Sequence, residues 1–107
     1  MPSPLGERVR ELRRKKGLTL EALAERVDSS KSYMWEIENK DVARPSGEKL
    51  HRIAQALDTT ADYLLATDEV TEADAADVAF FRNYQKMKPK SKERLREMLK
   101  ILDDEDE

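Results

Sequence analysis

Apolar residues in the first 65 positions recur every three or four residues, the spacing of a helix with one buried face. Read with the polar residues that precede each apolar run, this spacing predicts five helices, at about 5–16, 20–27, 30–38, 47–57 and 61–65. Side-chain oxygens suited to N-caps come before four of them: Thr19, Ser30, Ser46 and Thr60. Glycine and proline are sparse and β-branched runs are absent, so the predicted fold class is all-α.

Two further amphipathic helices follow, the first capped by Thr71 and ended by Pro89, the second capped by Ser91. A pair of about 30 residues is too small to bury two apolar stripes by itself. The stripes therefore need a partner surface: the preceding bundle, a second copy of the chain or another protein. We favour a helical hairpin that dimerises through seven residues: Phe80, Phe81, Tyr84, Leu95, Met98, Leu99 and Leu102.

The pattern divides the chain into four parts. We expect a helical domain over residues 1–66, a linker over 67–70, and a dimerisation or partner-binding hairpin over 71–102. The acidic stretch 103–107 is expected to be a solvated, disordered tail.

Composition excludes several functional classes. The chain has no cysteine and one histidine, His51, so neither a disulfide framework nor a multi-histidine metal cluster is expected, and no cofactor is predicted. No glycine-rich phosphate loop is present, the paired carboxylates lie on exposed helix faces, and we identify no catalytic residue. No apolar run approaches the ~20 residues of a membrane span, and no signal peptide precedes the first helix, which predicts a cytoplasmic protein.

Charge is distributed unevenly along the chain. Through Ala66 there are twelve basic and eleven acidic side chains, whereas from Thr67 onward there are eight and twelve. The net charge of −3 therefore comes from the C-terminal part. A near-neutral N-terminal half predicts modest non-specific affinity for a polyanion.

The second and third helices are joined by a short turn, the arrangement of a helix-turn-helix. Four separated blocks carry a wider resemblance: RVRELRRKKGLTLEALAERV, SSKSYMWEIE, RPSGEKLHRIAQAL and TADYLL. In order and spacing they resemble the lambda-repressor-like family of Cro and xenobiotic-response-element regulators. The resemblance implies a five-helix DNA-binding bundle and a recognition helix at about residues 30–38 that enters the major groove. It also implies a dimeric repressor, a homodimer on a pseudo-palindromic operator of double-stranded DNA.

The resemblance assigns roles residue by residue. It places base reading on Lys31, Ser32 and Glu36 of the recognition helix, and Trp35 beside them is a further candidate for contact with a thymine methyl or a sugar edge. Family position favours phosphate contact for Asn39 and Arg44, and the chemistry and place of five further side chains suit the same role: Thr19, Ser30, Tyr33, Lys40 and Lys49. Arg13 and Glu38 are expected to form a structural ion pair that fixes the recognition helix on the first helix. Two base-reading assignments have alternatives: Glu36 can be a solvated side chain that repels phosphates, and Trp35 can belong to a partner surface.

The sequence departs from the family pattern in two places. Leu20 stands where glutamine usually contacts a phosphate and braces the recognition helix, so one phosphate contact fewer is expected. Asp28 and Ser29 stand in the turn where glycine and a β-branched residue are common. Aspartate tolerates the left-handed conformation better than most residues, so the turn is expected to form at some cost.

A second function remains open from the sequence. In an antitoxin, the DNA-binding protein also neutralises a toxin through an extra segment, here the C-terminal helices. A related alternative is a mobile-element repressor controlled by an antirepressor or a dedicated peptidase. Heterocomplex formation distinguishes these alternatives from a homodimeric repressor.

Overall fold

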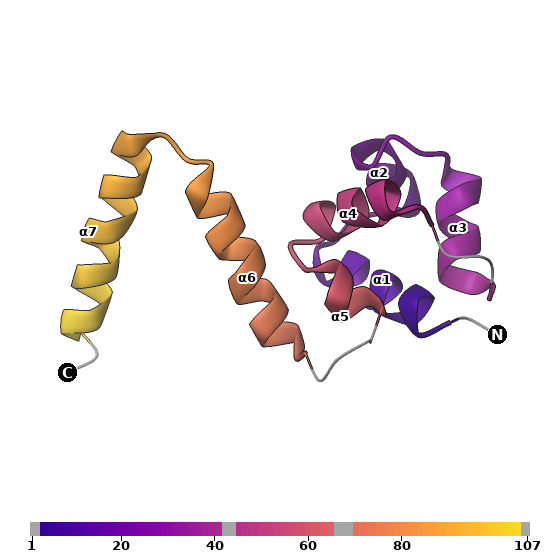
Figure 1. The fold of residues 1–107 in the computed structure, drawn as a ribbon, viewed down its shortest axis with the longest axis horizontal. Coiled ribbons are helices and arrows are strands. Elements are labelled where there is room, and N and C mark those ends of the chain that lie inside the picture. The colour runs from indigo at the N-terminus through magenta and orange to yellow at the C-terminus, as the bar shows by residue number, and fades with distance from the viewer. Residues whose placement is uncertain (1–2, 42–44, 66–69, 106–107) are drawn as a thin grey trace.

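The computed structural model describes residues 3–41, 45–65 and 70–105, and within these ranges it contains seven helices and no strand (Figure 1). The helices are α1 (Pro4–Lys15), α2 (Leu20–Arg26), α3 (Lys31–Asn39), α4 (Gly47–Ala56), α5 (Ala61–Leu65), α6 (Glu72–Gln85) and α7 (Pro89–Glu105). The all-α prediction is confirmed. None of the described helices is long and apolar enough to cross a membrane.

Helices α1 to α5 pack into one bundle around the apolar faces that the spacing predicts. Its most deeply buried side chains come from every helix of the bundle: Val9, Leu23, Met34, Ile53 and Leu64. Figure 1 shows α3 at the end of the bundle farthest from the C-terminal helices, next to α1 and α2. Burial of these aliphatic side chains provides most of the driving force for folding.

The chain ends and restarts its helices where the sequence predicts. The hydroxyl of Thr19 accepts a hydrogen bond from the backbone of Ala22, and Ser30 caps α3 through the N–H of Tyr33. Gly17, after α1, has a φ of 69°. Asp28 adopts the left-handed conformation with a φ of 55°, so the turn between α2 and α3 forms as expected.

The C-terminal boundaries differ from the sequence analysis. Ser91 lies inside the first turn of α7, which begins at Pro89, so the prediction that Ser91 caps this helix is wrong. Proline suits the first helical position because its missing N–H has no helical partner there. The helix continues through Asp103 and Asp104 to Glu105, so a disordered tail beginning at 103 is also wrong. Val70, assigned to the linker, packs partly buried against the core.

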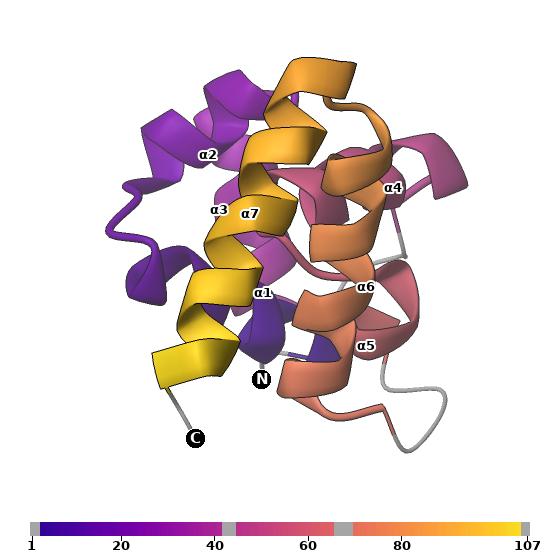
Figure 2. The same cartoon turned by 90° about the vertical axis from the view of Figure 1, so that its left-hand side faces the viewer.

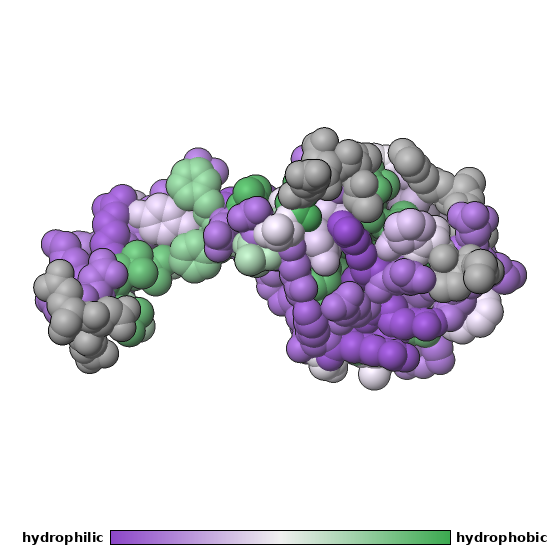
Figure 3. All heavy atoms as spheres, turned by 90° about the horizontal axis from the view of Figure 1, so that it is seen from below, coloured by the Kyte–Doolittle hydropathy of each residue, from purple (hydrophilic) through white to green (hydrophobic). Residues whose placement is uncertain are grey.

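Helices α6 and α7 form an open V beside the bundle (Figure 1). Viewed from the side of α7, both α6 and α7 lie in front of the bundle (Figure 2). Only α6 is buried against the bundle, through Ala75 and Ala79, and none of the described side chains of α7 is buried. In Figure 3 hydrophobic surface gathers on this arm, whereas the visible face of the bundle is mostly hydrophilic.

Candidate nucleic-acid interface

Helix α3 has a buried side and an exposed side of different chemistry. Met34, Ile37 and Glu38 are buried in the bundle. The exposed side carries the four residues expected to read bases, which together line one shallow hollow: Lys31, Ser32, Trp35 and Glu36. Trp35 is 45% exposed although it is the most apolar of the four. The face therefore offers a cation, a hydroxyl, an indole and a carboxylate to a ligand surface.

The end of α3 is fixed on α1 by a buried carboxylate. Arg13 donates from Nε to Glu38 Oε2 at 2.7 Å and from Nη2 to Oε1 at 2.9 Å, and Glu38 is 1% exposed. Nη1 of the same arginine donates to the carbonyl of Leu18 at 2.8 Å, which ties the start of the following turn into the network. Arg10 adds a second cation, with its Nε 3.5 Å from Glu38 Oε1. The paired bonds give α3 one orientation on the bundle.

Gly6 allows α1 and α3 to approach closely. A Cβ built on Gly6 would lie 2.4 Å from the carbonyl oxygen of Ile37 and 3.0 Å from that of Glu38. Backbone oxygens of a packed helix do not move aside as a flexible side chain does. Glycine is therefore required here for packing, and no local signal in the sequence predicts this contact.

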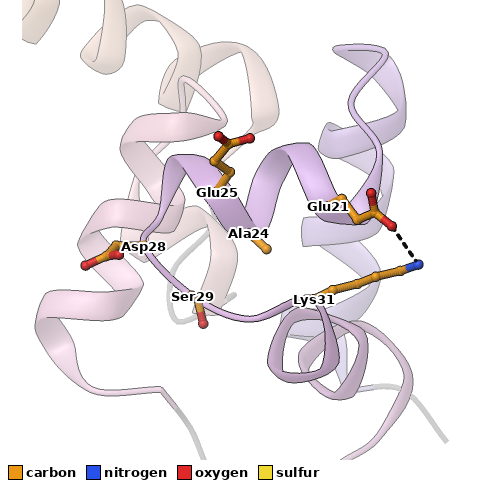
Figure 4. Close-up of a pocket in the computed structure, with 6 residues that line it drawn as sticks. All are labelled: Glu21, Ala24, Glu25, Asp28, Ser29 and Lys31. Carbon is orange, nitrogen blue, oxygen red and sulfur yellow. Dashed lines mark hydrogen bonds and ion pairs between the residues drawn. The ribbon is translucent and has the colours of Figure 1, made fainter.

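The groove between α2 and α3 joins Lys31 to an acidic surface. Lys31 Nζ lies 3.1 Å from Glu21 Oε1, and Figure 4 shows the two side chains pointing toward one another. Glu25 and Asp28 line the same hollow. The pair is exposed, so it contributes little to stability. The ammonium of Lys31 is therefore paired with an acidic side chain of α2 in the protein without DNA.

Two residues assigned to phosphates, Lys49 and Asn39, already have partners within the fold. Lys49 donates to the carbonyls of Val27 at 3.2 Å and Asp28 at 3.0 Å, where it caps the end of α2. The amide of Asn39 accepts a hydrogen bond from Arg10 and donates to the carbonyl of Trp35 at 2.8 Å. Both residues therefore stabilise the elements around α3.

The remaining phosphate candidates among the described residues lie at the start of α2, within α3 or at one of the ends of α3. Thr19 and Ser30 cap helices, as described above, and both are exposed. Tyr33 is half-buried, and this burial raises the pKa of its hydroxyl above 10.0. Lys40 Nζ lies 5.8 Å from the centre of the Trp35 ring, a cation–π distance. Arg44 lies outside the described residues.

Arg10 is the main residue of the site that the sequence analysis missed. It contacts both Glu38 and Asn39, which are the last two residues of α3. Its spacing of three from Arg13 places both arginines on one face of α1, which is the signal available in the sequence. Among the described residues, no group of three or more histidine, cysteine, aspartate or glutamate side chains is arranged to hold a metal ion.

A short helix, a tight turn and a second helix with an exposed polar face, all set in a five-helix bundle, define a helix-turn-helix domain. A family model described as a helix-turn-helix domain matches residues 4–67. The chain belongs to this family, which confirms the resemblance drawn from the sequence.

The curated relatives found include two bacterial regulators. The HTH-type transcriptional regulators SinR of Bacillus licheniformis and of Bacillus subtilis (strain 168) are each 34% identical to the chain over 70 residues. Each match spans 65% of this chain and 63% of the relative. These relatives are named as transcriptional regulators, and none is named as an enzyme.

Solved structures of SinR match at similar identity. A crystal structure of SinR, a master regulator of biofilm formation, in complex with DNA is 34% identical, with a TM-score of 0.54. It covers 57% of this chain and 97% of that chain. A complex of SinR protein with SinI protein is 28% identical, has a TM-score of 0.55, and covers 92% of this chain and 94% of that chain. The second match therefore includes the C-terminal helices.

Proposed function

We propose that the chain binds double-stranded DNA at specific sequences and regulates transcription, with α3 in the major groove. The carrying observation is the exposed face of α3, where Lys31, Ser32, Trp35 and Glu36 line one hollow on a helix fixed by a buried ion pair. The chain then acts by binding rather than by catalysis, and repression is the expected outcome because a bound dimer excludes polymerase from a promoter. In bacteria, the source of the SinR relatives, such a regulator works in the cytoplasm.

The chemistry of this face supports base reading. Lysine donates to guanine O6 and N7, serine hydroxyls serve several bases, and glutamate accepts from cytosine N4. The solved structure of SinR in complex with DNA, which is 34% identical to this chain, supports DNA binding by this fold. Within the described residues, two basic side chains near the helix already have partners: Lys49 binds the carbonyls of Val27 and Asp28, and Lys31 pairs with Glu21. Base contacts and the N-terminal amides of α2 and α3 must then provide a large share of the affinity.

Selection of binding sites from a pool of random duplexes tests the proposal. The enriched site is then titrated with protein by fluorescence anisotropy at several salt concentrations, against a scrambled duplex. Lys31→Ala should relax the preference at one base position, at a cost of about 1–3 kcal/mol on the preferred site. Lys90→Ala, an exposed lysine on α7, is the matched control. An enriched motif that is identical for both variants would remove Lys31 from the reading set, and no enriched motif at all would overturn the proposal.

We further propose that a second copy of the chain covers the apolar side of the C-terminal arm. Helix α7 exposes between 48% and 60% of each of four apolar side chains: Met98, Leu99, Ile101 and Leu102. Phe80 and Phe81 on α6 are 56% and 58% exposed, and Tyr84 on α6 and Leu95 on α7 are half-buried. An apolar patch of this kind on a helix without tertiary packing favours association. Two copies joined here suit a pseudo-palindromic operator.

The oligomeric state tests this second part. Sedimentation equilibrium of the full chain should give a dimer, and Leu99→Glu should give a monomer by placing a charge in the seam. Lys100→Glu changes the neighbouring exposed residue and should leave the dimer intact. A full chain that sediments as a monomer would instead favour the alternative partner.

The alternative is a different protein on the same apolar arm: a toxin, an antirepressor or a peptidase. The complex of SinR with SinI supports it, because that match covers 92% of this chain and so includes α6 and α7. In this case the purified chain is monomeric and binds its operator weakly. Addition of the partner then changes the affinity for DNA, and Leu99→Glu removes the effect of the partner.

A further inference from the structure

Helix α6 rests on the bundle through two alanines. Ala75 and Ala79 are both 0% exposed, and they lie four residues apart on one face of the helix. Ala75 belongs to the same hydrophobic cluster as the core of α1 to α5, whereas Ala79, equally buried, is not part of that cluster and lies on α6 between Ala75 and the contact of Arg82 with Thr59. Because neither side chain is exposed, a charged side chain at either position would have to lose its contact with water or displace α6.

Polar contacts hold α6 at both of its ends. At its start, Lys15 Nζ from α1 lies 2.8 Å from Glu72 Oε1 and 2.9 Å from Oε2. Near its end, Arg82 Nη1 donates to the carbonyl of Thr59 at 3.3 Å, and Asn83 Nδ2 donates to Asp58 Oδ1 at 3.4 Å. Ten residues of helix, about 15 Å, separate the two sets of contacts. We name these contacts, together with the two alanines, the α6 seat.

The α6 seat and the recognition helix share α1 as a support. Lys15 in the last turn of α1 binds Glu72, and Lys16 just after it pairs with Asp58. Arg13 on the same helix holds Glu38 at the end of α3. Helix α1 therefore joins the C-terminal arm to α3 through direct contacts at each step.

We propose that the α6 seat makes the arm a rigid strut that sets the distance and rotation between the two recognition helices of a dimer. This inference rests on the proposed DNA binding and on dimerisation through the arm. The seat then determines which spacing between half-sites the protein accepts, although none of its residues touches DNA. Ala79 and Glu72 are positioning residues for this specificity.

The geometry of DNA makes such a strut selective. Each added base pair moves a half-site by about 3.4 Å along the axis and rotates it by about 35°. If flexible segments joined the DNA-binding units of a dimer, the units could adjust to a changed spacing at little cost in free energy. A dimer built on a rigid strut must bend the DNA or break the seat. A strong preference for one spacing is therefore expected.

Distance measurements test the seat without DNA. The chain has no cysteine, so spin labels can be attached at two introduced cysteines, His51→Cys on α4 and Gln85→Cys on α6, both at exposed or half-exposed positions. Labelled chain diluted with unlabelled chain reports only distances within one molecule. Pulsed electron paramagnetic resonance should give one narrow distribution, also in the exposed-site control Ala76→Glu. In Ala79→Glu it should broaden, and a broad distribution in the parent chain would overturn the proposal.

Selection from duplexes carrying two half-sites at varied spacing then tests specificity. The parent chain and Ala76→Glu should enrich one spacing about tenfold over its neighbours, which corresponds to about 1.4 kcal/mol. Ala79→Glu should enrich the same half-site motif without a preferred spacing. If the parent enriches the motif at all spacings equally, the strut is overturned while DNA binding stands. If no motif is enriched but the distances are narrow, the seat exists and the proposed DNA binding fails. Measurements on the parent chain alone decide whether the arm is rigid and whether the protein binds specific DNA, even if Ala79→Glu does not fold.

Discussion

Arg13 donates two hydrogen bonds, of 2.7 and 2.9 Å, to the carboxylate of Glu38, and Glu38 is only 1% exposed. The side chain of Arg13 is 11% exposed, so the pair is largely removed from water. A buried pair of this kind is costly to break by changing one partner, because the other charge stays buried without compensation. The same contact determines how α3 is presented.

Glu38→Gln should therefore lower the free energy of unfolding by about 3–5 kcal/mol. Glu36→Gln, on the exposed side of the same helix, should change it by less than about 0.5 kcal/mol. Urea unfolding followed by far-ultraviolet circular dichroism measures both. Equal stability of the two variants would contradict the structural role assigned to the pair.

Two glycines in helices provide a matched test of the α1–α3 approach. In Gly6→Ala the new Cβ would lie 2.4 Å from the carbonyl oxygen of Ile37, so the helices must separate, at a cost of about 1–3 kcal/mol. At Gly47 no atom lies within 4 Å of a new Cβ. Gly47→Ala should leave stability unchanged or raise it by up to about 1 kcal/mol, because alanine favours helix. Thermal unfolding of both variants measures the difference. A melting temperature of Gly6→Ala no lower than that of Gly47→Ala would contradict this packing.

Local signals in the sequence predict much of the bundle. Thr19, Ser30 and Thr71 cap the helices for which they were proposed, and Asp28 takes the left-handed conformation expected in the turn. These features depend on residues within four positions of one another, so spacing and side-chain chemistry determine them. The exposed face of α3 follows from the same helical periodicity.

Contacts between distant segments were not predictable in this way. Lys15 and Glu72 are 57 residues apart, and neither carries a local signal for the other. In α6 the aromatic residues predicted the contact surface of the helix, whereas the two residues that the structure buries are small alanines. Lys49 was assigned to phosphate, but in the fold it donates to the backbone carbonyls at the end of α2. These acceptors lie more than 20 residues away in the sequence, so local spacing does not predict the contact.

The contact between α1 and α6 should be visible in the titration of Lys15. The hydrogen bond with Glu72 is the largest cause that raises the pKa of Lys15 above 10.5, and Glu11 contributes less. Glu72→Gln should therefore lower this pKa toward 10.5 by more than Glu11→Gln does. Nuclear magnetic resonance of ¹³C-labelled lysine side chains measures both. An equal effect of the two substitutions would place Glu72 away from Lys15.

The raised pKa of Lys15 also determines how the contribution of its contact with Glu72 to stability changes with pH. Because the pKa of Lys15 is higher in the folded state than in the unfolded state, the folded state binds the proton more tightly. The contribution of the contact is fully present below pH 10.5 and is lost as the pH rises through the folded-state pKa. Stability measured between pH 9 and pH 12 should fall less steeply in Glu72→Gln than in the parent chain.

Two truncations separate the roles of α6 and α7. A chain ending at residue 87 keeps α6 on the bundle, whereas one ending at residue 70 removes Ala75 and Ala79 and uncovers the bundle beneath them. The shorter chain should be less stable than the longer one by about 1–3 kcal/mol, because it loses this burial along with the polar contacts of the seat. Both truncated chains lack α7 and should sediment as monomers that bind one half-site with equal affinity. If the chain ending at 87 remained dimeric, the dimer contact would lie in α6 or the bundle; if the two chains were equally stable, α6 would not be seated on the bundle.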